Sequence, residues 1–482
     1  NNMVEEVQVV TGAFNAEYGQ AMSGIVNIVT RDGKNTYSGG VKTFLGDYVS
    51  SSDDVFWNID DLNPSAVSNF EADFSGPIKR DKLFFNVSGR HFSNDGHLYG
   101  RSVFEPEDVG VDPTGRLDVL NAGGSGDSSF VSMNPYQKSS GQAKLTWKQG
   151  NFKVALTGIG STESFNGGRG IQEMTFMPEW RRNEQKDAFT TFLKLTHTLS
   201  ATTFYELGIT RSKTEFDSAL FDDPFDARYQ DNTYIDFTDG INTSNFRVGG
   251  TDNGRFSRST ETYLVKWDLT SQFSKRNMVK AGIEFRKHDL NFLDEFTAVF
   301  PVGDELVQAQ VNNGEYNRKP TEASAYIQDK IEFEGLIVNI GLRWDYFNSD
   351  GPVLLDETDP NIVFEERRQD LEQNQIFKDS NAKSQISPRL GVSFPISEGG
   401  VVHFSYGWFF QIPNFNLLYQ NPYFRLGTSG SGLIGLIGNA NLRPQKTING
   451  EIGLKQSLSN STGVEITAFF RDINDLAGTA TD

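Results

Sequence analysis

Segments in which apolar and polar side chains alternate recur along almost the whole chain. In the stretch from residue 336 to 346, one face would carry Leu336, Val338, Ile340, Leu342 and Trp344, and the other Asn339, Arg343 and Asp345. Successive strand side chains point to opposite faces. A tilted strand of about 9–11 residues crosses a bilayer, whereas strands more commonly have about 5–6 residues. The pattern therefore predicts strands with one lipid-facing and one polar face.

The connections between these segments are alternately short and long. Short ones include residues 199–202 and 334–335, and long ones include residues 94–137, 216–257 and 347–383. Outer-membrane barrels have short periplasmic turns and long extracellular loops. We therefore predict an all-β, antiparallel up-and-down transmembrane β-barrel. Its fifteen strands should be centred near Val41, Ala72, Phe85, Leu145, Leu156, Leu193, Leu207, Val265, Ile283, Ile327, Ile340, Leu390, Phe404, Ile452 and Ile466.

The composition fits a barrel and excludes several other classes of protein. The mean hydropathy is -0.45, and no apolar run approaches the roughly 18 residues of a membrane helix. A barrel tolerates this value because every second side chain faces a polar lumen. The chain has no cysteine, which excludes disulfides and thiolate metal sites, and its net charge of -19 argues against a nucleic-acid partner.

The first thirty residues follow a different pattern. Residues 4–10 and 24–30 have the composition of two short strands, and residues 11–20 separate them. This arrangement is typical of the end of a small globular domain. The chain opens directly on a strand pattern without a signal peptide, so we expect the gene product to begin upstream.

Residues 4–31 resemble the end of the plug domain of TonB-dependent outer-membrane receptors. The resemblance rests on an E-V-x-V strand, a Y-G turn and a G-x-x-N-I-x-T segment, whose motif residues here are Glu17, Tyr18, Gly19, Gly24, Asn27 and Thr30. Residues 14–19 look most like the Oar-like group of Bacteroidota and less like SusC-type glycan importers. Residues 441–454 and 463–476 are similar to two barrel-strand motifs of the family, with Arg443 and Gln445 replacing the usual Lys and Glu.

The resemblance implies a domain division. Residues 1–33 would be the C-terminal end of the plug, and residues 34–482 would be the barrel. Family barrels have 22 strands, so the resemblance implies a fragment of a longer receptor that lacks most of the plug and the last strands. We expect open sheet edges near Val41 and Leu476, because only a closed barrel pairs every strand.

The resemblance also implies a function. A TonB-dependent receptor takes up a scarce small-molecule, peptide or glycan ligand across the outer membrane of a Gram-negative cell, energised by the TonB-ExbB-ExbD complex. A passive porin or a surface adhesin on the same barrel, and a soluble all-β propeller, are the alternatives. The plug-like segment argues against a porin, and the absence of a blade-length repeat argues against a propeller.

The sequence gives little support for an enzyme or a cofactor. Five histidines are present, none in an H-E-x-x-H motif, and no G-x-S-x-G nucleophile motif has its triad partners in order. Acidic pairs such as Asp53-Asp54 and Asp60-Asp61 offer carboxylates to calcium, but their spacing fits no twelve-residue calcium loop, so solvated loops are the simpler interpretation. We predict a protein without catalytic residues, cofactor or metal.

Two sets of side chains are candidates for ligand contacts. Where a strand enters a long loop, aromatic faces could stack on a sugar or an apolar group: Trp408, Phe409, Phe415, Tyr419 and Tyr423. The alternative places Trp408 and Phe410 in the lipid-facing aromatic girdle and the other rings in loop packing. Lumen charges could steer a ligand or pair between strands, as in any wet lumen: Glu284, Arg286, Arg343, Asp345, Glu451 and Arg471.

Overall fold

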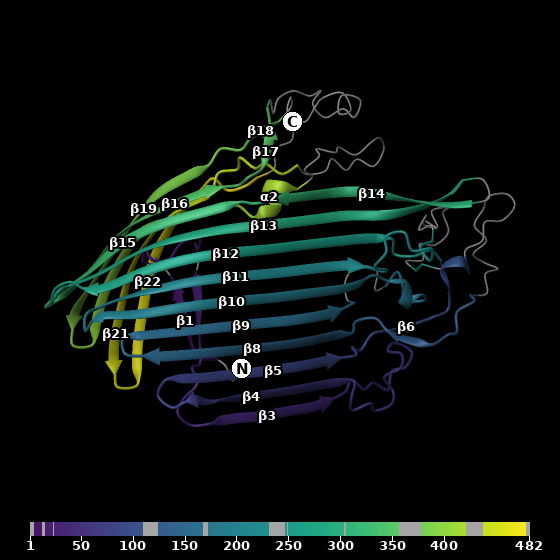
Figure 1. Cartoon of the computed structure of the whole chain (residues 1–482), viewed down its shortest axis with the longest axis horizontal. Coiled ribbons are helices and arrows are strands. Elements are labelled where there is room, and N and C mark those ends of the chain that lie inside the picture. The colour runs from purple at the N-terminus through teal and green to yellow at the C-terminus, as the bar shows by residue number, and fades with distance from the viewer. Residues whose placement is uncertain are drawn as a thin grey trace.

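A large, curved antiparallel sheet makes up most of the computed structural model (Figure 1). The structure describes residues 4–11, 15–22, 24–108, 124–166, 172–230, 246–247, 249–302, 305–355, 377–420 and 437–478. Within these ranges, no helix has the length and apolar character that crossing a membrane requires.

The main sheet has 16 strands, and fifteen of them follow one another in chain order. These fifteen are β3 (Ser38–Gly46), β4 (Val67–Lys79), β5 (Leu83–Asn94), β8 (Tyr136–Gln149), β9 (Phe152–Phe165), β10 (Asn183–Ser200), β11 (Thr203–Ala219), β12 (Gly254–Gln272), β13 (Asn277–Val302), β15 (Thr321–Phe333), β16 (Leu336–Asn348), β19 (Lys383–Ser397), β20 (Gly400–Gln411), β21 (Gln445–Ser459) and β22 (Thr462–Asn474). Each predicted strand centre falls in one of them, so the predicted up-and-down topology is confirmed.

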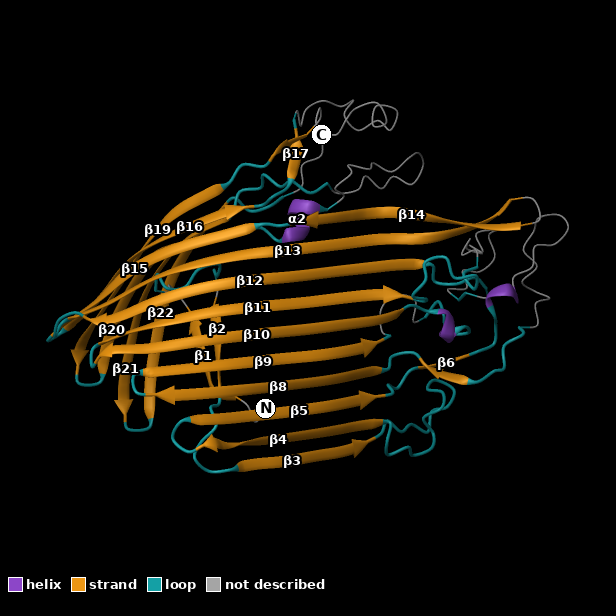
Figure 2. Ribbon diagram, viewed as in Figure 1, coloured by secondary structure: helices purple, strands orange, loops and turns teal. Residues whose placement is uncertain are grey.

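The remaining elements are small or lie in the long connections. They are β1 (Val4–Thr11), β2 (Gly24–Thr30), β6 (Tyr99–Arg101), β7 (Phe130–Ser132), β14 (Glu305–Arg318), β17 (Pro352–Leu354), β18 (Phe377–Asp379), the short helix α2 (Phe415–Tyr419) and two 3-10 turns at Pro106–Asp108 and Pro178–Trp180. Figure 2 shows the long connections at the ends of the strands opposite the tight turns.

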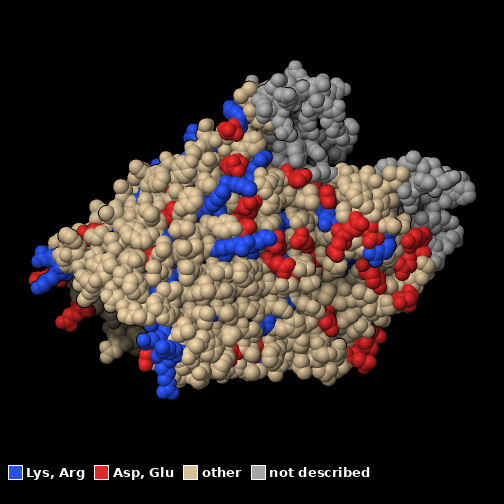
Figure 3. Space-filling model, viewed as in Figure 1, with Lys and Arg blue, Asp and Glu red and all other residues tan. Residues whose placement is uncertain are grey.

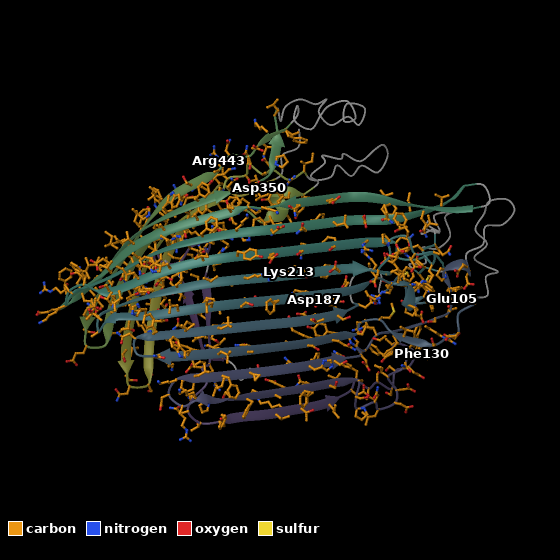
Figure 4. The ribbon with its side chains drawn as sticks, viewed as in Figure 1. Glu105, Phe130, Asp187, Lys213, Asp350 and Arg443 are labelled. Atoms are coloured by element: carbon orange, nitrogen blue, oxygen red, sulfur yellow. The ribbon has the colours of Figure 1, made fainter. Side chains whose placement is uncertain are left out.

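The two faces of the sheet differ as the alternation predicts. On β16, Ile340, Leu342 and Trp344 are exposed on the outer face, whereas Arg343 and Asp345 are buried on the inner face, with 4% and 3% of their surface accessible. Figure 3 shows a largely uncharged band on the outer face, between charged side chains at the tight turns on the left and a zone of basic and acidic side chains toward the long connections. Figure 4 places Asp187 of β10 and Lys213 of β11 in this charged zone. An uncharged belt next to a charged zone is the surface that a membrane barrel presents to lipid and water.

Within the described part of the chain, both end strands of the fifteen-strand path have an unpaired edge, and β14, which pairs only with β13, has another. There β3 pairs only with β4, and β22 pairs only with β21. The sheet curves at the left of Figure 1, where β21 and β22 run steeply across the picture, and β1 and β2 form a separate two-stranded sheet on the concave side. We call this concave side the lumen.

The sequence did not predict the extension of β13. This strand has 26 residues; its first part pairs with β15, and its last part pairs with β14. The strands β12, β13 and β14 therefore continue beyond the neighbouring β15.

Candidate functional site

A turn between β1 and β2 is docked on the lumen side of the sheet. The carboxylate of Glu17 forms a 2.9 Å ion pair with Lys280 of β13, and its backbone N–H donates to the Gln328 side chain of β15 at 3.2 Å. The Arg343 guanidinium of β16 donates to the backbone oxygen of Ala16 at 3.3 Å. Three neighbouring strands therefore hold one short turn, residues 15–20, which we call the plug turn.

Two glycines make this close approach possible. A Cβ atom at Gly19 would lie 2.3 Å from the Arg343 guanidinium, and a Cβ atom at Gly341 would lie 2.8 Å from the Cβ of Ala16. Real Cβ atoms are not found this near to other heavy atoms. A side chain at position 19 of the predicted motif would therefore force the Arg343 guanidinium to shift.

Arg343 is also paired within its own strand. Its Nε donates to Asp345 Oδ1 at 2.8 Å, and both side chains are almost fully buried. The arrangement brings together two of the predicted lumen charges and connects them to the plug turn. A buried ion pair of this kind requires both partners, because removing one leaves an uncompensated charge.

The predicted charges on β13, Glu284 and Arg286, lie in a second network of ion pairs. Arg286 pairs with Glu284 at 2.7 Å and with Glu322 of β15 at 3.6 Å. The His288 ring contacts Glu322 at 2.8 Å and the Thr262 hydroxyl at 2.9 Å. Sequence reasoning missed Glu322 and His288, although both occupy lumen-facing positions in the same alternation that selected Glu284 and Arg286.

Glu451 and Arg471 lie on β21 and β22, which are three and four strands away from β16 in the sheet. Glu451 of β21 approaches the His403 ring of β20 at 3.3 Å. Arg471 lies on the edge strand β22, opposite Asn449, and is exposed. The structure therefore does not bring these two predicted residues into the Arg343 cluster.

The remaining motif residues hold the two-stranded sheet together. Gly24 pairs with Thr11 across β1 and β2, and the Asn27 amide donates to the Gln8 side chain at 3.2 Å. The Tyr18 N–H donates to the Asn15 carbonyl at 3.2 Å and closes the plug turn. Burial, together with the neighbouring Glu17 carboxylate, raises the pKa of the Tyr18 hydroxyl.

A second set of contacts with the barrel wall lies at the end of β2 and just after it, and we call it the second anchor. The Lys144 ammonium of β8 donates to the Thr30 carbonyl at 2.9 Å and to its hydroxyl at 3.1 Å. Asp32 accepts ion pairs from Lys144 at 2.8 Å and from Lys153 of β9 at 2.6 Å. Burial acts to raise the pKa of Asp32, but the two ammonium groups outweigh it and lower the pKa from 3.8 to about 2.

The lowered pKa gives a testable pH dependence. A depressed carboxyl pKa stabilises the docked state above the ordinary pKa, and this contribution, about 1.4 kcal/mol once solvent screening of the partly exposed group is allowed for, disappears as the pH falls from near 4 through 2. In the full-length receptor, Asp32→Asn should therefore speed pepsin cleavage within residues 24–36 roughly tenfold at pH 5, and the difference should shrink toward pH 2. Asp54→Asn, in an exposed connection, is the matched control. Equal cleavage of wild type and Asp32→Asn at pH 5 would contradict the anchor.

The predicted aromatic residues are mostly packed by other parts of the protein. Phe409 is buried, with the Arg389 guanidinium 3.7 Å from its ring centre, and Trp408 lies under the Lys446 ammonium at 4.0 Å. Tyr419 is buried and donates its hydroxyl to the Ser349 carbonyl. Tyr423 lies outside the described residues.

Phe410 corrects one interpretation of this segment. It was placed in the lipid-facing girdle, but only 4% of its surface is accessible. Phe410 belongs to a cluster with Tyr316, Phe347 and Leu418, because the connection between β20 and β21 folds over the end of its strand. Alternation within a strand does not report such a covering loop.

Phe415 is the one predicted aromatic residue that lines a described hollow. This hollow has a volume of about 370 Å³ and lies between α2 and the lumen side of β9 to β14. The connection that carries α2 is also tied to the plug turn, because the Ile412 N–H donates to the Gln20 side chain at 2.9 Å. The hollow and the plug turn thus share one connecting segment.

Metal ligands do not gather in the described part of the chain. No group of three or more His, Cys, Asp or Glu side chains there has the arrangement of a metal site. The acidic pairs near Asp53 and Asp60 form no such group.

A comparison with models of protein families shows to which family the chain is related. The model described as "TonB dependent receptor-like, beta-barrel" matches residues 136–482. The chain belongs to this family. It is an outer-membrane β-barrel chain, and its curved antiparallel sheet is the barrel wall. The comparison with curated proteins found no match.

Solved structures show the same fold. The outer membrane transporter YddB from Escherichia coli has 13% identity and a TM-score of 0.63 over 97% of this chain and 56% of its own. The siderophore receptor PirA from Acinetobacter baumannii has 16% identity and a TM-score of 0.60 over 98% and 58%. The FrpB iron transporter (F3-3 variant) from Neisseria meningitidis has 14% identity and a TM-score of 0.58 over 98% and 62%. The chain thus spans about three-fifths of the length of these structures.

Proposed function

We propose that the receptor containing this chain imports a scarce ligand across the outer membrane in an energised step. Residues 1–33 would be the end of its plug, and residues 34–482 would belong to its barrel. The observation that carries the proposal is the plug turn in the lumen, held by Lys280, Gln328 and Arg343. Family membership supports the same function.

The chemistry of these contacts suits a plug that detaches without damage to the barrel. The plug turn is held by hydrogen bonds and an ion pair to side chains, and water can replace such partners at a net cost of about 1 kcal/mol each. The strands are held by backbone hydrogen bonds, which have no replacement within lipid. A pulling force from a TonB-ExbB-ExbD complex would therefore release the plug before it opened the wall.

The ligand class is left broad by the comparisons. The similar structures include proteins named as siderophore, iron and copper transporters. Such ligands are scarce, so passive diffusion would supply too little of them, and this fits an energised importer. A peptide or glycan ligand fits equally well. The proposed mechanism is conformational and needs no catalytic residue in the chain.

Conductance in planar bilayers tests the plug assignment without a known ligand. The full-length receptor should show no stable open channel, and a version without its whole plug domain should conduct, because removal of the plug empties a polar lumen. A full-length receptor that conducts steadily would favour the passive-porin alternative.

Chemical labelling in cells tests energisation. The 482 residues contain no cysteine, so within this chain Ala21→Cys introduces a single thiol, beside the plug turn. In respiring cells a membrane-permeant maleimide should label it several-fold faster than in cells treated with a protonophore or lacking TonB. Labelling at the same rate in all three would contradict energised movement of the plug, and Ser461→Cys, in an exposed turn, controls for reagent access.

A further inference from the structure

One row of lumen-facing residues crosses seven neighbouring strands. The residues stand directly opposite one another, from β8 to β14: Lys138, Glu163, Lys186, Phe216, Arg258, Phe292 and Tyr316. We call them the rim row. Phe292 and Lys280 are an even number of positions apart on β13, and Lys280 contacts the plug turn, so the row faces the lumen.

The rim row carries an excess of positive charge. Lys138 and Glu163 neutralise each other in a 2.6 Å ion pair. Lys186 and Arg258 form no ion pair with another residue in the described ranges. They flank Phe216 on the two neighbouring strands, each about 4.8 Å away along the sheet. In a chain with a net charge of -19, this is a local site of positive potential that attracts anions.

Aromatic rings form a nearly continuous surface along the same wall. The ring centres of Phe216 and Phe256 are 5.7 Å apart, those of Phe256 and Phe292 are 5.3 Å apart, and those of Phe292 and Tyr316 are 5.0 Å apart and stacked. Phe165 extends the surface on the other side of Phe216 at 6.3 Å. Flat apolar faces are therefore presented beside the two cations.

The centre of the rim row forms one wall of the 370 Å³ hollow. The opposite wall is the start of α2, with Asn414, Phe415 and Asn416. No carboxylate lines the hollow, and its neutral hydrogen-bonding groups are amides and hydroxyls. A ligand there would meet rings on two sides, two cations, and neutral groups that both donate and accept hydrogen bonds.

We infer that this hollow binds an acidic oligosaccharide. The C–H face of a pyranose ring stacks on aromatic rings, its hydroxyls bond to amides and hydroxyls, and its carboxylates pair with Lys186 and Arg258. The alternation of cation, ring and cation at the strand spacing matches a ligand that repeats a sugar ring with an apolar C–H face and a negative charge. A neutral glycan would leave both cations without partners, and an apolar ligand would leave the amides without partners. The inference rests on the proposed importer function and names its ligand class.

Calorimetric titration of the full-length receptor in detergent tests the inference. Two acidic hexamers, of galacturonate and of mannuronate, are compared with the neutral hexamers maltohexaose and cellohexaose. At least one acidic hexamer should bind at least tenfold more tightly than both neutral ones. Its affinity should fall as the salt concentration rises from 0.05 to 0.5 M, because charge pairs at an open site are screened. Lys186→Gln and Arg258→Gln should each weaken binding about tenfold, and Phe216→Leu should weaken it while leaving the salt dependence unchanged.

Lys194→Gln is the matched control. It removes the same charge from the same lumen-facing side of β10, but eight positions nearer the tight turn, where Lys194 pairs with Glu206. Acidic binding that survives Lys186→Gln and Arg258→Gln, or neutral hexamers that bind as well as acidic ones, would overturn the inference. A ferric tris-catecholate that binds where no acidic glycan does would also overturn it. In each case the conductance and labelling experiments would still decide the importer function separately.

Discussion

Ile340→Arg should prevent most of the full-length receptor from assembling, whereas Asn339→Arg should leave assembly close to the wild-type level. Ile340 is 54% exposed on the outer face of β16, and Asn339 is directed into the lumen. An arginine on the lipid face near the middle of the bilayer costs about 2–4 kcal/mol, and one in a wet lumen costs little. The same substitution to arginine should therefore affect assembly differently at two adjacent positions of one strand.

Heat-modifiable gel mobility of outer-membrane fractions measures the result. The folded band should be reduced several-fold for Ile340→Arg and little changed for Asn339→Arg, with Ile340→Leu as the conservative control. Similar losses for the two arginine variants would mean that the faces of β16 are assigned wrongly.

The strands and their faces were predictable because two solvents constrain them. Lipid lies on one side of the wall and a polar lumen on the other, so a slip of one residue would move every side chain to the wrong side. The alternation from Leu336 to Tyr346 is therefore sufficient to predict the face of Arg343 and Asp345. The short turns were predictable for the same reason, because each of them interrupts the alternation for only a few residues.

The connections were not predictable in the same way. Beyond the bilayer no second solvent imposes alternation, and packing between distant segments decides the structure. Strand β14 exists because β13 continues past the membrane belt and offers it an edge. Phe410 is buried because Leu418 and Tyr419 of a later connection cover it.

The candidate site was predictable in its residues but not in its partners. The motif selected Glu17 and Gly19, and the alternation selected Arg343. Their contacts join residues 263 and 327 positions apart, such as Glu17 with Lys280 and Ala16 with Arg343. Which strand faces the plug turn depends on the curvature of the whole sheet, and no local sequence pattern encodes this curvature.

The second large effect is expected at this contact. Arg343→Ala should destabilise the full-length receptor by about 3 kcal/mol, because it leaves the Asp345 carboxylate buried without its 2.8 Å partner. It also removes the donor to the Ala16 carbonyl, so the plug turn should lose protection. Arg389 of the neighbouring strand β19 is another lumen-facing cation, but its guanidinium is engaged with the Phe409 ring.

The double variant Arg343→Met with Asp345→Leu separates these two consequences. Apolar side chains of similar size can replace a buried ion pair at little cost, so the double variant should regain most of the melting temperature lost by Arg343→Ala. It still lacks the hydrogen bond to Ala16, so amide exchange of residues 15–22 should be faster than wild type in both variants. Calorimetry and hydrogen exchange measure the two effects. If Arg343→Ala melts as the wild type does, or if exchange in the plug turn is unchanged, Arg343 does not hold the plug turn to the barrel wall.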